Sequence, residues 1–173
     1  MAETALNVLL VFYSRYGAAE QLALAAGVGA LQARSNIRLR RLPDLADART
    51  IEQDPAWRDA LARMQRDYVA PRPADPLWAD VIVIAVPAEP SGEAEAYLAS
   101  LAEGDAMRGK TLVPLAVDRS PAALARLTTA GAAAGLTVAP LSIDSGDGLA
   151  DAREHGRRVA EDARARKPGP ARA

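Results

Sequence analysis

Val11–Gln21, VFYSRYGAAEQ, joins an apolar segment to a helical one through a short polar turn. The apolar run Leu6–Tyr13 is nearly continuous, which is typical of a strand buried on both faces. Ser14 and Gly17 interrupt it, and a helix is expected from about residue 18 to residue 33. A serine, a glycine that lets the backbone come close and the positive end of a helix predict a turn that binds a phosphate or another anion. A plain strand-to-helix turn is the alternative, because Gly and Ser are common in such turns.

Apolar runs and helical patterns alternate along the rest of the chain. Further strands are predicted at Ile37–Leu42, Val81–Val86, Thr111–Val117 and Thr137–Ile143. Further helices are predicted at Asp54–Val69, Gly92–Glu103, Ser120–Ala134 and Leu149–Arg166, and APRPADP (70–76) is read as an extended connector. The alternation predicts an α/β fold, a flavodoxin-like three-layer sandwich whose five-stranded parallel sheet has the order 2-1-3-4-5. In that fold a ligand lies beyond the carboxyl ends of strands 1 and 3.

The spacing of apolar residues predicts which sides of the helices are apolar. In the first helix Leu24, Val28 and Leu31 share one face. Proline at position 140 suits an edge strand. The face expected to be buried in the last helix consists of Leu149, Ala152, Gly156, Val159 and Ala163, with the glycine permitting close approach.

The composition indicates one domain, residues 1–167, followed by a tail at 168–173 that we expect to be disordered. Half of the 173 residues are hydrophobic but only 4% are aromatic, so few rings are present to stack on a flat ligand. A net charge of −1 gives no electrostatic footprint for nucleic acid or an anionic membrane. The absence of cysteine excludes disulfides and thiolate chemistry.

Neither end of the chain suggests export or membrane insertion. The first residues lack the basic and apolar regions of a signal peptide, and no apolar run approaches the roughly 20 residues of a membrane span. We therefore expect a cytoplasmic protein.

Several other residues are candidates for chemistry, each with a simpler interpretation. Asp118 and Glu89 follow neighbouring strands and form a possible acid–base pair, although nothing in the sequence sets their spacing. His155, the only histidine, is expected at the surface or an interface. The aspartates of the DSGDG turn (144–148) are explained by turn formation, so no metal site is predicted. The two tryptophans fit core or interface packing.

The segment VLLVFYSRYGAAEQLA resembles the first motif of the WrbA-type flavoproteins, in which a run such as YYSxYGHT binds the phosphate of FMN. LWADVIVIAVP and LADAREHGRRVAEDA are similar to the strand-3 region and the last helix of that family. Members are FMN-dependent NAD(P)H:quinone oxidoreductases that commonly form tetramers and carry out the two-electron reduction of quinones.

When the family's motifs are aligned with this sequence, the resemblance implies a cofactor site made from the loops after strands 1, 3 and 4. In the first loop the matching residues are retained, and Ala18 and Ala19 stand where the family has larger side chains. The second loop, PAEPSGE (87–93), keeps only Pro87 of a PTRFGN-like run and lacks the aromatic residue. The third loop is DRSP (118–121) in place of a Ser/Thr/Gly-rich segment. The implied cofactor-binding residues are Ser14, Arg15, Tyr16, Gly17, Ala18, Ala19, Pro87, Ala88, Glu89, Pro90 and Asp118.

Three functional hypotheses follow. The resemblance implies an FMN-dependent NAD(P)H:quinone oxidoreductase that forms a homo-oligomer, a dimer or a tetramer, with a small-molecule quinone as acceptor and no catalytic side chain. The altered second and third loops favour an alternative, a diverged protein that has lost FMN and acts as a binding or assembly module. An electron-carrying flavodoxin is the least favoured, because it usually needs an acidic surface and flanking rings around the flavin.

Overall fold

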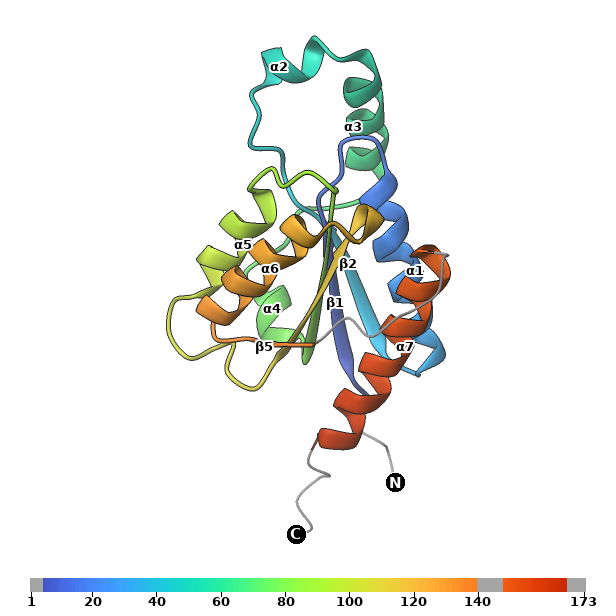
Figure 1. Ribbon diagram of the computed structural model, residues 1–173, viewed down its shortest axis with the longest axis vertical. Helices are drawn as coiled ribbons and strands as arrows, with labels where there is room; N and C mark the ends of the chain where they lie inside the picture. The colour runs from blue at the N-terminus through green and yellow to red at the C-terminus, as the bar shows by residue number, and fades with distance from the viewer. Residues whose placement is uncertain (1–4, 140–147, 168–173) are drawn as a thin grey trace.

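The computed structural model describes residues 5–139 and 148–167, which form one sheet with helices on both of its faces (Figure 1). The elements, in chain order, are β1 (Asn7–Phe12), α1 (Ala18–Gln32), β2 (Asn36–Arg41), α2 (Ala48–Glu52), α3 (Pro55–Asp67), α4 (Ala74–Trp78), β3 (Val81–Val86), α5 (Glu93–Leu101), β4 (Thr111–Ala116), η1 (Val117–Arg119), α6 (Pro121–Ala133), β5 (Thr137–Val138) and α7 (Gly148–Arg166). None of the helices within these two ranges is long and apolar enough to cross a membrane.

The sheet confirms the predicted topology. Its order is β2-β1-β3-β4-β5, and all of the pairs are parallel. Phe12 lies opposite both Arg41 and Ala85, and Val86 lies opposite Ala116, so the loops after β1, β3 and β4 leave from one edge. Of the fifth predicted strand the structure describes Thr137 and Val138; the position of Pro140 and the aspartates of the DSGDG turn lie outside the described residues.

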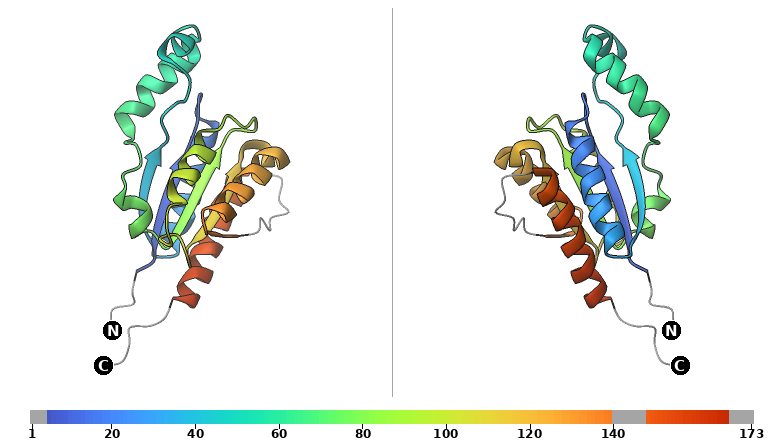
Figure 2. Two further views of the ribbon diagram at one scale, coloured as in Figure 1. Left: turned by 90° about the vertical axis from the view of Figure 1, so that its left-hand side faces the viewer. Right: turned by 90° about the vertical axis from the view of Figure 1, so that its right-hand side faces the viewer.

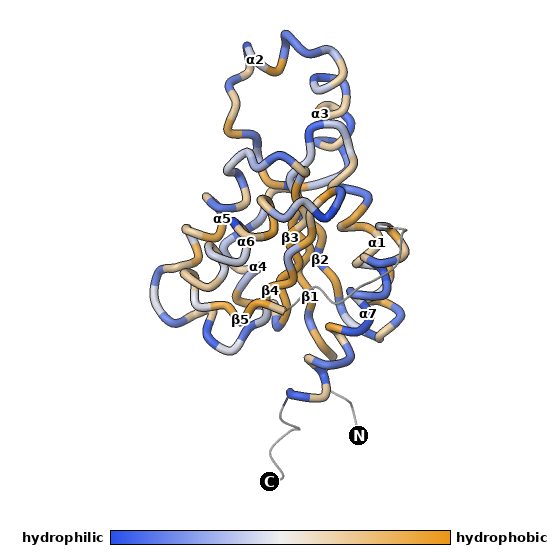
Figure 3. Tube along the Cα trace, in the orientation of Figure 1, coloured by the Kyte–Doolittle hydropathy of each residue, from blue (hydrophilic) through white to orange (hydrophobic). Residues whose placement is uncertain are grey.

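Strict alternation along the central strands divides the core into two layers. Val8, Leu10 and Phe12 of β1 contact the helices on one face, and Leu9 and Val11 contact those on the other. The first layer lies under α1, α3 and α7, and the second under α5 and α6, as the side views in Figure 2 show. The hydropathy trace shows the apolar strands in the middle of the molecule, between the helices of the two faces (Figure 3).

The contact between α1 and α7 corrects one sequence-based expectation. The apolar face of Leu24, Val28 and Leu31 is largely exposed, at 36%, 44% and 52%. Alanines and glycines cover the sheet and α7 instead, since a Cβ on Gly29 would lie 1.9 Å from the Arg153 carbonyl oxygen and one on Gly156 would lie 2.3 Å from the Ala26 carbonyl oxygen. Two helices that approach at backbone contact need small residues. The close approach predicted at Gly156 is confirmed, whereas apolar periodicity does not reveal the small-residue face of α1.

The buried face of α7 was also predicted in part. Ala152, Gly156 and Val159 are buried and Ala163 packs against the core, but Leu149 is 45% exposed. His155 was expected at the surface or an interface, and this was wrong, because it is 3% exposed within the chain. Burial lowers the pKa of His155, so the imidazole is neutral near pH 7.

Of the three helices between β2 and β3, α2 and α3 lie beyond the carboxyl ends of the strands, and α4 lies beside the sheet, just before β3 begins (Figure 1). α3 begins with Asp54 as N-cap and Pro55 at its first position, as predicted. The extended connector was wrong in its second half, where Ala74–Trp78 forms α4, because Pro73 and Pro76 occupy first-turn positions that need no donor. The short helix α2 was not predicted, although Asp47 caps it by accepting a hydrogen bond from Thr50 N.

Candidate functional site

A pocket of about 380 Å³ lies at the carboxyl edge, where the loops after β1, β3 and β4 meet. We call it the strand-end pocket. Of the predicted site residues, Gly17 lies within the first loop without lining the pocket, and Asp118 is replaced in the lining by its neighbour Val117. Ser91 was not predicted. The lining consists of Ser14, Arg15, Tyr16, Ala18, Ala19, Pro87, Ala88, Glu89, Pro90, Ser91 and Val117.

The first loop presents unused donors to this pocket. Gly17 adopts φ 118°, which favours glycine, and its N–H donates to the Ser14 Oγ at 2.8 Å. The first helical bond of α1 runs from Gln21 N to Gly17 O, so the N–H groups of Ala18 and Ala19 have no helical carbonyl partner. No side chain caps α1, in contrast to α2, α3 and α6. Because the Ser14 hydroxyl accepts from Gly17, its proton is available for a ligand.

Side chains of the first loop are held in place by residues of the segment between β2 and β3. The Arg15 guanidinium lies 4.4 Å from the centroid of the Trp57 ring and donates to the Tyr13 hydroxyl at 3.4 Å. This hydrogen bond raises the pKa of Arg15, which therefore stays cationic. Tyr16 is 58% exposed, and its hydroxyl donates to Asp54 at 2.5 Å. Tyr16 is the aromatic residue of the lining, so it is the ring that a flat ligand would meet.

Asp44 connects this arrangement to the sheet. It accepts hydrogen bonds from the Tyr13 hydroxyl at 2.9 Å, from Trp57 Nε1 at 3.2 Å and from Arg41 at 3.0 Å. The Arg41 guanidinium also donates to the Ser14 carbonyl at 3.1 Å. Both side chains of the Arg41–Asp44 pair are 6% exposed. The buried Arg41–Asp44 ion pair thus holds the first loop against the sheet, and sequence reasoning missed this pair.

A carboxylate also lies at the start of α1. Glu20 is 2% exposed, and Arg63 donates to both of its oxygens, at 2.9 and 2.6 Å. The Tyr68 hydroxyl donates to the same carboxylate at 2.6 Å. These bonds, chiefly that from Arg63, lower the pKa of Glu20. The negative charge of Glu20 is favourable near the N-terminus of α1. Arg63 neutralises this charge, so Glu20 repels an anionic ligand at the helix start less strongly.

The second loop is held differently. Among the described residues no hydrogen bond involves Pro87–Ser91, and Glu89 is exposed. After β4, the chain turns through residues 117–119, where Asp118 and Arg119 have positive φ values of 54° and 50°. Since Val117 and not Asp118 lines the pocket, the lining contains one carboxylate, that of Glu89. Within 5–139 and 148–167, no group of acidic or histidine side chains is arranged to hold a metal.

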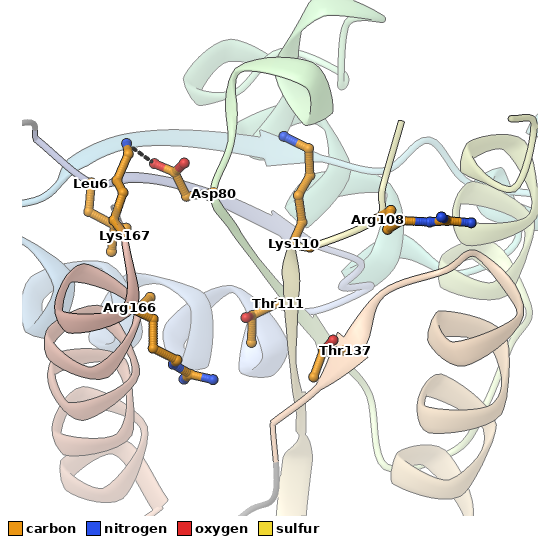
Figure 4. A pocket seen from close by; sticks show the side chains of 10 residues that line it. Leu6, Asp80, Arg108, Lys110, Thr111, Thr137, Arg166 and Lys167 are labelled. Atoms are coloured by element: carbon orange, nitrogen blue, oxygen red, sulfur yellow. Dashed lines mark hydrogen bonds and ion pairs between the residues drawn. The ribbon is translucent and has the colours of Figure 1, made fainter. Parts of the chain in front are cut away.

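Another pocket, of about 470 Å³, lies at the opposite end of the sheet (Figure 4). It is mainly basic, but the two lysines are already engaged. Lys167 donates to Asp80 at 2.9 Å, and Lys110 donates to the Leu77 carbonyl at 3.1 Å and to that of Ala79. Burial lowers the pKa of Lys110. None of the predicted site residues lines this pocket, so the strand-end pocket is the candidate site.

No protein-family model and no curated protein sequence matches the chain. Solved structures do match over most of its length. A flavodoxin from the domain Archaea aligns with a TM-score of 0.63 at 15% identity, covering 91% of this chain and 99% of that one. Two-electron reduced Megasphaera elsdenii flavodoxin aligns at 0.59 and 19%, covering 89% and 98%. The flavodoxin of Streptococcus pneumonia TIGR4 aligns at 0.56 and 17%, covering 94% and 100%.

The chain has the flavodoxin-like fold. At these identities the likeness shows the fold alone.

Proposed function

We propose that the chain binds FMN in the strand-end pocket and serves as a flavin-dependent oxidoreductase. The observation that carries the proposal is the uncapped start of α1, which offers free N–H groups and the Ser14 hydroxyl to the same pocket. Helix N-termini of this kind favour a phosphate group. The pocket volume of about 380 Å³ falls within the usual range of small-molecule sites.

The residues of the first loop fit the phosphate end of FMN. Ser14 Oγ and the N–H groups of Ala18 and Ala19 would hold the phosphate oxygens, and Arg15 would supply a positive charge at the pocket wall. The flavin end has less support. Tyr16 and the apolar surfaces of Pro87, Pro90 and Val117 would contact the ring system, in place of a dedicated aromatic residue in the second loop.

When bound, FMN supplies the hydride chemistry, and the protein contributes binding, orientation and exclusion of water. The resemblance of the first motif to WrbA-type proteins supports NAD(P)H as reductant and a quinone as acceptor. No side chain needs to act as an acid or base, which agrees with a lining that holds neither histidine nor cysteine.

A titration with FMN tests the proposal. The purified protein is incubated with excess FMN, desalted, and examined for the visible absorption of the flavin. Co-elution of the flavin, followed by its bleaching with NADH or NADPH and recovery with a quinone, is the expected result. A colourless eluate together with no saturable binding by calorimetry would contradict it.

The second candidate is a binding or assembly module that has lost FMN. It is favoured by the second loop, where Glu89 faces the pocket mouth and no ring is present. In this case the uncapped turn would bind inorganic phosphate or a phosphorylated ligand while FMN fails to bind. Calorimetry with phosphate and with FMN separates the two candidates.

We also propose self-association, as the WrbA resemblance implies. The exposed apolar residues Leu24, Val28 and Leu31 of α1 support it. Sedimentation of the wild type and of Val28→Glu tests this directly, and a monomeric wild type would contradict it.

A further inference from the structure

An apolar groove lies outside the strand-end pocket. It has a volume of about 620 Å³, and α5 forms one of its walls. The opposite wall consists of the segment after β2 and of the connector that leads into α4. Leu42 and Met107, each 2% exposed, lie at its base. None of the proposed FMN contacts lines this groove, which we call the proline groove, so a ligand here is separate from the cofactor.

The wall opposite α5 is preformed. Proline fixes its own φ and restricts the residue before it, so a proline-rich wall changes little between empty and occupied states. Proline also lacks an N–H group, so this wall presents apolar rings and few donors. Leu45 and Leu77 remain 63% and 61% exposed at the rim and extend the apolar surface. The prolines are Pro43, Pro71, Pro73 and Pro76.

Two buried polar atoms on the α5 wall have no partner among the described residues. Glu93 is 5% exposed; its Oε1 accepts from Leu45 N at 3.4 Å, whereas its Oε2 accepts no hydrogen bond. The hydroxyl of Tyr97, one helical turn later, is also buried and unpaired. The two atoms have different surroundings, because Glu93 lies near Tyr13 and Arg15, whereas Tyr97 lies near Asp75 and Arg40. Buried polar groups without partners are rare in folded proteins and often mark the place of a ligand or a water molecule.

The chemistry of these atoms defines what they would bind. An ionised carboxylate only accepts hydrogen bonds, so Glu93 needs a donor. The ionisable side chains of the lining are two glutamates, Glu93 and Glu103, against one arginine, Arg72, apart from Tyr97. Burial raises the pKa of Tyr97, so its hydroxyl keeps its proton.

We propose that the proline groove binds an apolar molecule that carries a primary amine, with the ammonium group on Glu93 and the apolar body along the proline wall. A primary ammonium has three donors and a positive charge, which matches a buried carboxylate with an oxygen that accepts no hydrogen bond.

The probe is n-octylamine, and octanoate, which has the same length and the opposite charge, is its counterpart. The full chain is labelled with ¹³C at the methionine methyl groups. Met107 lies in the groove, whereas Met64, which is 0% exposed, lies in the core layer on the other face of the sheet. Octylamine should shift the Met107 signal saturably and leave that of Met64 unchanged. Its affinity should exceed that of octanoate by about tenfold or more, as for a charge-assisted hydrogen bond.

Substitutions on α5 locate the binding site. Ala96 lines the groove and Ala99 does not, although both are exposed on this helix. Ala96→Phe should fill the groove and abolish the Met107 shift, whereas Ala99→Phe should leave it unchanged. Glu93→Gln should remove most of the preference for octylamine over octanoate.

The proposal is wrong if octylamine gives no saturable shift at Met107, if it shifts Met64 equally, or if octanoate binds as tightly. It is also wrong if Ala96→Phe and Ala99→Phe behave alike. Should Glu93→Gln fail to fold, the comparison with octanoate and the alanine pair still decide the outcome. The result is independent of FMN, because the proline groove and the strand-end pocket can be titrated separately.

Discussion

Two loops at the same edge of the sheet are held in opposite ways. The loop after β1 is fixed by Gly17 on Ser14, by Arg41 on the Ser14 carbonyl, and by the stacking of Arg15 on a tryptophan. The loop after β3, Pro87–Ser91, takes part in no hydrogen bond among the described residues. The loop after β1 is therefore preformed without a ligand. The backbone N–H and C=O groups of the loop after β3 remain available to bind a ligand.

The difference shows which part of a ligand the chain recognises. A preformed turn at a helix start suits a compact anion of fixed geometry, whereas a loop without internal bonds suits a larger group of variable shape. The two loops should accordingly respond differently to substitution.

The largest effect is expected at the buried support of the first loop. Asp44→Ala leaves the Arg41 guanidinium buried without its carboxylate, so the free energy of unfolding should fall by about 3 kcal/mol. Urea unfolding followed by tryptophan fluorescence measures it. Asp47→Ala, which removes an exposed N-cap three residues later, is the control and should lose much less. Equal losses would show that the buried pair does not support the loop.

Next comes the phosphate turn itself. Gly17→Asp would place a carboxylate beside the bound phosphate, and FMN affinity should fall about a hundredfold or more. Because Gly17 has φ 118°, any side chain there is also strained. Gly17→Ala carries that strain without the charge and serves as the control, with a smaller loss expected. Unchanged affinity in Gly17→Asp, measured by calorimetry, would mean that this loop is not the site.

A smaller effect is expected for the carboxylate at the start of α1. Arg63 lowers the pKa of Glu20 in the folded chain, so the ionised pair stabilises the fold above the ordinary glutamate pKa. This contribution should disappear as the pH falls below about 4, the unfolded glutamate pKa being about 4.3. Glu20→Gln should lose about 1 kcal/mol at pH 7 and show a weaker pH dependence, since Arg63 is 42% exposed.

Unfolding curves at pH 7 and pH 3 provide this comparison. Glu95→Gln, which breaks the more exposed pair with Arg126, is the matched control and should change less. If Glu20→Gln retained the full acid sensitivity of the wild type, the pair would not be the source of it.

The smallest effect is expected in the unanchored loop. Glu89 is exposed at the pocket mouth, so Glu89→Gln should raise FMN affinity only about twofold to threefold at low ionic strength. The gain should vanish in 1 M salt, where exposed charges are screened. A loss of affinity in Glu89→Gln would instead indicate that this carboxylate contacts the ligand directly.

The fold could be predicted because its signals are local. Continuous apolar strands alternate with capped helices, and Asp54, Ser120 and Gly135 mark helix ends as expected. The packing of α1 on α7 could not be predicted in the same way. Alanine and glycine contribute little to an apolar pattern. The larger residues Leu24, Val28 and Leu31 therefore determined the predicted apolar face of α1, and the small residues that contact α7 were missed.

For the site, the rule for carboxyl ends of parallel strands was sufficient to bring the first two loops together. The residues that support the first loop were not foreseen. Asp44 and Trp57 belong to the segment between β2 and β3, and their contacts depend on how that segment packs against the sheet. Glu20 and Arg63 are 43 positions apart, and nothing local links them. Whether the pocket residues bind a cofactor stays a prediction.

The edge strand β2 also bears on how the protein behaves when concentrated. Arg38 and Arg40 both bind Asp75, at 3.1 and 2.7 Å, and Arg40 also covers the Leu39 carbonyl at 3.0 Å. The amide of Arg41 is taken by the Val69 carbonyl at 3.1 Å. A second chain that tried to extend the sheet here would have to desolvate guanidinium groups and displace these bonds. The arginine side chains of β2 therefore disfavour edge-to-edge pairing of two sheets, and we expect any self-association to use the helical surfaces instead.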